Sequence, residues 1–235
     1  MAFANIQGAF GTSVASGASS WSVTLSAAPT LGHLVIASVY YYNPNYSPLP
    51  TITIKDGNSN SYTLSPSSPY QPSGAAGSNG YIYIAYLLSA PSNATATITV
   101  TVTPALTTSA YAVVRAEEFS YGSGTLSLDT DIGGHGTSAT TINSPSITPA
   151  ASGELLYAFG IPSNAITSAN SPWTQDSAGI DDNGDDGEYI LSAASGSTSV
   201  NFTQSSGSGN WFVLATAFKL LASANTSLPL LGCGG

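Results

Sequence analysis

Short runs of β-branched and aromatic residues alternate along the chain with clusters of Gly, Pro, Asn and Ser. Within residues 95–103, Thr alternates with Ala, Ile, Val and Val, and residues 81–84 (YIYI) alternate similarly. A period of two is typical of an antiparallel strand with one apolar face and one solvated face. Helical periodicity is nearly absent, so the pattern predicts an all-β protein.

The pattern predicts strands at residues 21–25, 34–42, 51–55, 62–64, 81–88, 95–103, 110–119, 155–161, 188–192, 199–203 and 211–220. Residues 56–58 (DGN) and 79–80 (NG) favour tight hairpin turns, because Gly and Asn tolerate positive φ. We expect one domain over residues 20–220, preceded by an N-terminal arm (1–19) and followed by a C-terminal tail (221–235).

Two stretches of the chain resemble each other. GHLVIA (32–37) is similar to GELLYA (153–158), and YAVV (111–114) is similar to WFVL (211–214). The implied repeat units are residues 32–119 and 153–218. Each unit would form a four-strand sheet with one apolar face, and the two sheets would bury these faces against each other. The sequence therefore predicts one antiparallel β-sandwich of jelly-roll type.

The composition limits the partners of this sandwich. Only 6% of the 235 residues are charged, against about 25% in an ordinary soluble domain. The chain contains 38 Ser and 25 Thr, and 42% of it is hydrophobic, which is enough for a core. Three basic residues and a net charge of −9 argue against nucleic acid as a partner.

The chain ends and the cysteine content give further expectations. A single cysteine, Cys233, excludes an intrachain disulfide framework. The N-terminal residues lack the pattern of a secretory signal, and no apolar run approaches the length of a membrane span. Residues 1–17 and 221–235 are uncharged and partly apolar. We expect these tails to pack against neighbouring copies, by strand addition to an exposed sheet edge, or to fold back on their own domain.

The densest cluster of candidate ligands is DDNGDDGE (181–188), which contains five carboxylates within eight residues. Asp181, Asn183 and Asp185 have the 1-3-5 spacing of calcium loops, and Asp186 and Glu188 add two further carboxylates. Glycine stands at the seventh position rather than the sixth, and the glutamate comes too early for a helix-loop-helix site. One interpretation of these five residues is a calcium site. The alternative is a solvated hairpin whose charges discourage edge-to-edge association.

A second candidate site is rich in tyrosine. Tyr40, Tyr41, Tyr42, Asn43 and Tyr46 place aromatic rings beside amide groups, a combination that can stack on a sugar and bind its hydroxyls. In a strand, however, Tyr40 and Tyr42 share one face and Tyr41 lies on the other. The segment is therefore either a glycan-binding loop or a part of the core.

Candidate catalytic residues are few. His33 and His135 are the two histidines, and the chain contains no G-x-S-x-G motif. Glu117 and Glu118 are adjacent on a predicted strand and point to opposite faces, which makes them a poor glycosidase pair. We expect one of them to pair with Arg115. A jelly-roll enzyme that degrades polysaccharides, using His135 or Glu118, is a third class of function.

Several segments together carry a family resemblance: SWSVT (20–24), GHLVIA (32–37), IKDGN (54–58), YTL (62–64) and WFVLATAF (211–218). Over about residues 20–220 the chain resembles Ser/Thr/Gly-rich β-sandwich domains of phage virion proteins and of secreted bacterial surface proteins. The resemblance implies a virion or extracellular location and supplies no catalytic residues.

These observations favour a non-enzymatic structural subunit of a virion or an extracellular assembly, such as a phage capsid decoration or tail-associated protein. Its partners would be copies of itself or other virion or filament proteins. The alternative is a carbohydrate-binding or adhesin module, with calcium at the acidic loop as its only candidate cofactor.

Overall fold

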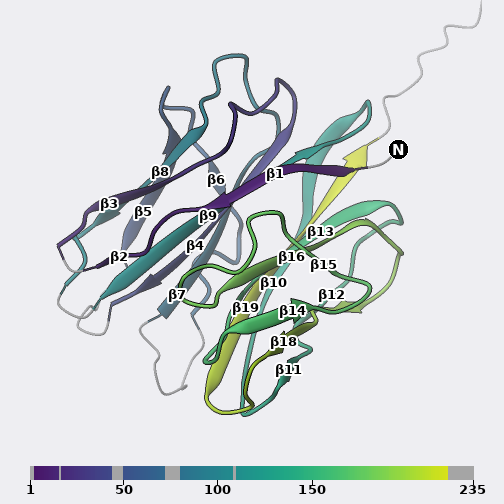
Figure 1. Cartoon of the computed structure of the whole chain (residues 1–235). Coiled ribbons are helices and arrows are strands. Elements are labelled where there is room, and N and C mark those ends of the chain that lie inside the picture. Colours follow the sequence, from purple (N-terminus) through teal and green to yellow (C-terminus); the bar gives the residue numbers. More distant parts are fainter. Residues whose placement is uncertain (1–2, 16, 44–49, 72–79, 108–109, 222–235) are drawn as a thin grey trace, which may run out of the picture.

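The computed structural model describes residues 3–15, 17–43, 50–71, 80–107 and 110–221, and the protein is all-β (Figure 1). Its strands up to residue 120 are β1 (Ala4–Phe10), β2 (Val14–Ala15), β3 (Ser20–Thr24), β4 (Leu34–Tyr42), β5 (Thr51–Asp56), β6 (Thr63–Leu64), β7 (Gly80–Leu87), β8 (Thr97–Thr103) and β9 (Tyr111–Ser120). The later strands are β10 (Thr125–Thr137), β11 (Thr141–Ile142), β12 (Ser146–Ile147), β13 (Glu154–Ile161), β14 (Ile166–Ala169), β15 (Thr174–Gln175), β16 (Asp186–Ala193), β17 (Thr198–Ser199), β18 (Phe202–Gln204) and β19 (Asn210–Leu221).

The strands form four layers. The first inner sheet has the order β1-β9-β4-β7-β6, with β2 also paired to β9, and the first outer sheet has the order β3-β8-β5. The second inner sheet has the order β10-β19-β13-β16-β15. The second outer layer consists of β11-β18-β14 and β12-β17. Figure 1 shows the two halves of the chain side by side, the first in purple to teal and the second in green to yellow.

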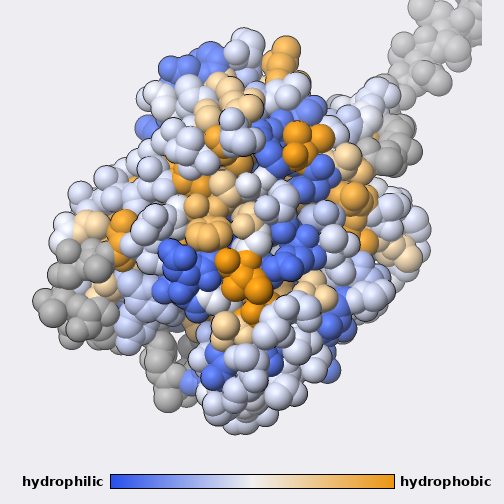
Figure 2. Space-filling model, in the orientation of Figure 1, coloured by the Kyte–Doolittle hydropathy of each residue, from blue (hydrophilic) through white to orange (hydrophobic). Residues whose placement is uncertain are grey.

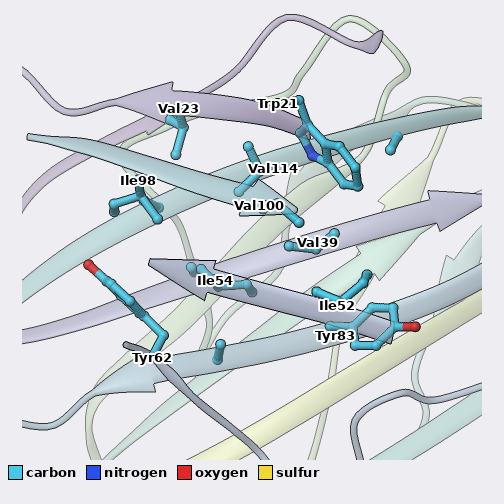
Figure 3. Close-up of a cluster of buried hydrophobic side chains, with 14 of the residues drawn as sticks. Trp21, Val23, Val39, Ile52, Ile54, Tyr62, Tyr83, Ile98, Val100 and Val114 are labelled. Carbon is cyan, nitrogen blue, oxygen red and sulfur yellow. The ribbon is translucent and has the colours of Figure 1, made fainter. Parts of the chain in front are cut away.

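Three hydrophobic clusters lie between these layers. The first joins the outer and inner sheets of the first half, and Figure 3 shows β3, β5 and β8 contributing Trp21, Ile54 and Val100 to it. The second joins the two inner sheets, with Phe119 and Phe218 among its members. The third joins the second inner sheet to the second outer layer. The molecule is therefore a pair of β-sandwiches that share a central core.

This layering explains two different sequence patterns. Strands of the outer sheet have one buried face, so β3 and β5 alternate between buried and exposed residues. Strands of the inner sheets are covered on both faces, and β13 is buried at every position. The sequence pattern predicted one apolar face for each of these sheets. The continuous apolar runs of β4 and β13 reflect the additional cover by the outer layers.

The internal repeat is visible in the topology. Both inner sheets have the same strand order if β1, β9, β4, β7 and β6 are matched in turn with β10, β19, β13, β16 and β15. The register agrees, because Leu34 pairs with Phe119 and Leu155 pairs with Phe218. With its outer sheet, each half has the strand order of a jelly roll. Each repeat thus contains a complete jelly roll rather than the four strands expected.

Other expectations differ from the structure in detail. The predicted N-terminal arm contains β1, which pairs with β9 and so belongs to the first inner sheet. The long strand β10 was missed because its sequence, TLSLDTDIGGHGT, contains charges and three glycines. The predicted strand at 199–203 is divided between β17 and β18. Nearly all of the predicted C-terminal tail lies outside the described residues.

Candidate functional site

The most concentrated chemistry lies where the first inner sheet meets residues 176–186 of the second half. Arg115 of β9 is fully buried, and its Nη2 donates to Asp176 Oδ1 at 2.6 Å and to Asp186 Oδ1 at 3.2 Å. The same guanidinium donates to the backbone carbonyl oxygens of Gly179, at 2.6 Å, and Asp185, at 3.1 Å. One side chain of the first half therefore holds a long segment of the second half.

Strand geometry places this arginine. Alternate residues of β9 face the second inner sheet, and Arg115 follows Val113 on that face, where its guanidinium lies 5.5 Å from the centre of the Phe159 ring. Burial opposes the charge on Arg115, but the neighbouring Asp176 carboxylate raises its pKa above the ordinary value. Arginine suits this position because it stays charged and presents several donors in one plane.

Asp176 also connects the pair to a buried chain of hydroxyl groups. The Tyr157 hydroxyl donates to Asp176 Oδ2 at 3.3 Å and accepts a hydrogen bond from Ser38 Oγ at 3.0 Å. A Cβ at position 187 would collide with Asp176 Oδ2, so Gly187 is required for this approach. Ser38 belongs to β4 and Tyr157 to β13, so the network links the two inner sheets.

The neighbouring residues 181–185 form a tight turn. Asp181 Oδ1 accepts hydrogen bonds from the backbone N–H groups of Asn183, at 2.9 Å, and Asp185, at 3.0 Å. Gly184 has a φ of +83°, which a glycine adopts without strain. Asp181 and Asp185 are buried, whereas Asp182 and Asn183 are exposed. The turn thus carries an exposed tip above two buried carboxyl groups.

Several buried carboxylate oxygens near this turn have no hydrogen-bond partner: Asp181 Oδ2, Asp185 Oδ2, Asp186 Oδ2 and Glu188 Oε2. Burial raises the pKa of Asp186 to about 7 and that of Glu188 to about 8. Burial also raises the pKa of Asp185 well above its ordinary value, and the adjacent Asp181 carboxylate raises it further. Leaving such oxygens unpaired is costly when the groups are charged.

The five-residue calcium set predicted from the sequence is not brought together. Asp186 Oδ1 binds Arg115, Glu188 Oε1 accepts from the Asn201 N–H at 2.9 Å, and Asn183 Nδ2 donates to Ser13 Oγ at 2.5 Å. Across the described ranges, no group of three or more His, Cys, Asp or Glu side chains is arranged to hold a metal ion. Asp181, Asp185, Asp186 and Glu188 of the predicted set each keep one carboxylate oxygen without a hydrogen-bond partner.

The tyrosine-rich segment is largely internal. Tyr41 is fully buried in the first cluster, and Tyr40 is buried in the central core against the rings of Tyr111 and Phe212. Asn43 is also buried and donates to the Tyr41 hydroxyl at 2.8 Å. Tyr42 is partly exposed, and Tyr46 lies outside the described residues. Among the described members of this set, Tyr40, Tyr41 and Asn43 are buried and so are not exposed for stacking on a sugar.

The candidate catalytic residues lie in separate places. His33 Nδ1 is 2.6 Å from Glu118 Oε1, whereas His135 Nδ1 is 2.7 Å from the Tyr70 hydroxyl. Glu117 accepts hydrogen bonds from Asn5, Ser177 and Ala178, and burial raises its pKa to about 8. The two glutamates face opposite sides of β9 as predicted. The expected pairing of one of them with Arg115 was wrong, because Arg115 binds Asp176 and Asp186.

One cavity of about 240 Å³ is lined by Phe3, Ala151, Ser152, Gly153, Glu154, Lys219 and Leu220. Another cavity, about 190 Å³, lies beside β10 and β12. Typical sites for small molecules are larger, roughly 300–1,000 Å³.

Sequence reasoning missed the Arg115 network, whose acidic partners lie more than 60 positions away in the chain.

The fold and these contacts define an all-β protein made of two jelly rolls. They are joined through a buried polar seam that consists of Arg115, Asp176, Asp186, Tyr157 and Ser38. No protein-family model matches the chain, and no similar curated protein or solved structure was found. Within the described ranges, no helix is long and apolar enough to cross a membrane.

Proposed function

We propose that the protein is a non-enzymatic structural subunit of a virion or an extracellular assembly, in which copies associate through exposed sheet edges. A phage capsid decoration or tail-associated protein is the form of this function that the sequence favours. The observation that carries the proposal is the edge strand β1 (Ala4–Phe10), which lies at the end of the first inner sheet.

Strand β1 has the properties of an edge that accepts another strand. Its sequence, ANIQGAF, contains no charged residue, and Ile6 is 49% exposed at a register shift between Asn5 and Gln7. Natural proteins usually protect such edges with lysine, proline or inward-pointing charges, because an edge strand offers unpaired backbone N–H and C=O groups. Strand addition at β1 would join copies through main-chain hydrogen bonds.

The rest of the molecule has properties that are expected of a subunit in a larger assembly. The two inner sheets are packed together through a continuous core, which favours a rigid body. In Figure 2, much of the visible face is pale, the colour of residues with hydropathy near zero, with small blue and orange areas between. Jelly rolls are also common in viral capsids.

The test is the native mass of the full-length protein by light scattering, together with electron microscopy of the same sample. We expect rings, filaments or other defined oligomers. Replacing Ile6 with lysine places a charge on the edge strand, and Ile6→Lys is expected to shift the population to monomers.

Leu31→Lys is the matched control, since Leu31 is 67% exposed but lies in a turn rather than on a sheet edge. It is expected to leave the assembly unchanged. A wild-type protein that stays monomeric at every concentration contradicts the proposal, as does equal disruption by both variants.

A further inference from the structure

Lys219, Asp129 and Glu154 lie together near the end of β19 and the starts of β10 and β13. Lys219 Nζ is 2.6 Å from Asp129 Oδ1, and the Asp129 side chain is only 7% exposed. Glu154 is 2% exposed, and its carboxyl group shares a hydrogen bond with that of Asp129. An amine, a carboxyl group and a second, buried carboxyl group are therefore in contact.

Three neighbouring strands bring these side chains together. β19 lies between β10 and β13 in the second inner sheet. Leu155 pairs with Phe218, so the antiparallel register continues with Glu154 opposite Lys219. Asp129 is the extra residue of a bulge in β10, and a bulge changes the direction of a side chain. The bulge explains how a carboxylate of the edge strand reaches the lysine.

The hydrogen bonds of this cluster give each carboxyl group a distinct state. Asp129 Oδ1 accepts from Lys219 Nζ, and Asp129 Oδ2 accepts from the Ala150 N–H at 2.8 Å. Glu154 Oε1 accepts from the Ala151 N–H at 2.8 Å, and no donor among the described residues reaches Oε2. Burial raises the pKa of Glu154, and the Asp129 carboxylate raises it further. Glu154 Oε2 therefore holds a proton that it donates to Asp129.

The first half of the molecule has different residues at the three equivalent positions. They are Ile6, Ser120 and His33, in place of Asp129, Lys219 and Glu154 respectively. The alignment follows from the register, because Phe119 and Phe218 occupy equivalent places in the two sheets. In each half, the bulge residue directly follows the strand partner of that phenylalanine. The jelly-roll fold forms without this trio, so the fold alone does not explain its presence in the second half.

We propose that Lys219 and Asp129 react to form an intramolecular amide, an isopeptide bond. A proton passes from the Lys219 ammonium to Asp129 Oδ1, which gives a neutral amine and a carboxylic acid. Nζ then attacks Cγ, and the Ala150 N–H stabilises the negative charge that forms on Oδ2.

Glu154 completes the reaction as a proton relay. It donates its proton to Oδ1 and takes one from Nζ, while the Cγ–Oδ1 bond breaks and Oδ1 leaves as water. Glu154 ends unchanged, and one ammonium and one carboxylate have become one amide and one water. The water can leave through the 240 Å³ cavity that Glu154 and Lys219 line.

The ion pair is the starting state of this reaction, and it makes the reaction slow. The hydrogen bond to Asp129 raises the pKa of Lys219. Burial opposes the charge on Asp129, but the hydrogen bond from Lys219 lowers its pKa. Permanent contact offsets this cost, since the effective concentration of well-oriented groups reaches about 10⁵–10⁸ M. The bond would close a loop of about 90 residues (129–219), which predicts a melting temperature higher by about 10–20 °C.

The experiment measures the intact mass of the purified full-length protein. We expect it to lie below the sequence mass by the mass of one water molecule. The chain contains three Lys or Arg residues, so trypsin cleaves after residues 55, 115 and 219. It does not cleave after an acylated lysine, so residues 116–235 should remain one peptide that lacks one water. Chymotrypsin should release a branched peptide that contains both Asp129 and Lys219.

Two variants separate the bond from the ion pair. Lys219→Arg keeps a cation beside Asp129 but removes the nucleophile, so we expect the full sequence mass and a melting temperature lower by about 10–20 °C. Glu154→Gln preserves the volume but cannot relay a proton, and should still have its full mass when the wild type has reacted completely. Lys55→Arg is the matched control and should lose one water as the wild type does.

A folded wild-type protein with its full sequence mass overturns the proposal and leaves an ordinary ion pair. A loss of water that maps to any residues other than Asp129 and Lys219 also overturns it. Bond formation in Glu154→Gln as complete as in the wild type contradicts the role of Glu154. All of these measurements report on single chains, so none depends on how copies assemble.

Discussion

The Asp56 turn (56–60) and the Asp181 turn (181–185) share a pattern of backbone hydrogen bonds but differ in how fully the first carboxylate is hydrogen-bonded. In each, the first residue accepts from the backbone N–H groups two and four positions later, and the fourth residue has positive φ. The Asp56 turn ends in Asn60, whose amide donates to the carboxylate; the Asp181 turn ends in Asp185, which cannot donate when ionised. One side-chain group therefore separates a turn whose first carboxylate is fully hydrogen-bonded from a turn that leaves Asp181 Oδ2 without a partner.

This comparison of the two turns shows that the 1-3-5 spacing does not by itself determine the chemistry of the acidic loop at residues 181–188. The 1-3-5 spacing that indicates calcium loops is here the spacing of an Asx turn, which also occurs at Asp56 without a second carboxylate. What distinguishes the Asp181 turn is the buried carboxylate of Asp185 and the nearby seam around Arg115.

The largest expected effect comes from releasing the Asp181 turn from its anchor. Arg115→Met removes the donor to the Asp185 carbonyl oxygen and leaves Asp176 and Asp186 buried without a counterion. We expect the free energy of unfolding to fall by about 3–5 kcal/mol, measured by urea denaturation. Lys55→Met, at an exposed position, is the control and should change it by less than ~0.5 kcal/mol. A loss below ~1 kcal/mol in Arg115→Met would show that the seam is not an anchor.

The next effect concerns the strand that follows the Asp181 turn. Glu188 has a pKa raised by burial to about 8, and Asp186 nearby raises it as well. The folded protein therefore keeps a proton that the unfolded chain releases above about pH 4.5, and stability is lost as the pH rises from there to about 8. Glu188→Gln removes this loss, and at about pH 9 the variant should exceed the wild type by about 2–4 kcal/mol.

Denaturation of both proteins at about pH 5 and about pH 9 measures this gain. Asp182→Asn, at an exposed position, serves as the control and should follow the wild-type curve. Parallel curves for Glu188→Gln and the wild type would mean that the buried carboxyl does not titrate in this range.

Converting the Asp56 turn into a copy of the Asp181 turn is expected to have a smaller effect. Asn60→Asp removes the donor to Asp56 Oδ2 and places a second carboxylate beside it. Because Asn60 is partly exposed, solvent screens the repulsion, and we expect a loss of about 1–2 kcal/mol. Asn58→Asp adds the same charge at an exposed position and should cost less. Equal losses would show that the side-chain donor of Asn60 is unimportant.

The smallest effect concerns the positive-φ position of each turn. Ser59 has a φ of +67°, whereas the Asp181 turn has glycine at the equivalent position. Ser59→Gly relieves the strain of a side chain in this region but increases the freedom of the unfolded chain, so the net gain should be about 0.5 kcal/mol. Thermal unfolding measures it. Gly184→Ser should be destabilising, since a Cβ there would meet Ala165; a destabilised Ser59→Gly would contradict the explanation.

Much of the secondary structure could be predicted from local patterns. The prediction of a strand at 34–42 matches β4, and the predicted strands at 51–55 and 211–220 lie within one or two residues of β5 and β19. Missed strands lacked the signal: β10 contains GGHG, and β14 and β15 are short. These segments become strands because neighbours such as β19 supply hydrogen-bond partners along their length.

The candidate site was predictable only in its composition. The acidic residues at 181–188 stand out in a chain with so few charges. The sequence does not reveal, however, which partner each of these side chains contacts. Asp186 contacts Arg115 and Glu188 contacts the Asn201 N–H, although alternation along β16 would place both side chains on the same face. Tyr40 and Tyr41 are both buried because β4, which carries them, lies between two cores.

By itself, the sequence determined the all-β class, the repeated halves and the absence of a surplus of basic side chains. Periodicity and composition are local or additive properties, so they can be read without knowing contacts. Tertiary structure alone decided that each half is a complete jelly roll, that Arg115 joins them, and that Asp181 and Asp185 are both buried. These outcomes depend on which faces meet, and sheet packing brings together residues that are remote in the chain.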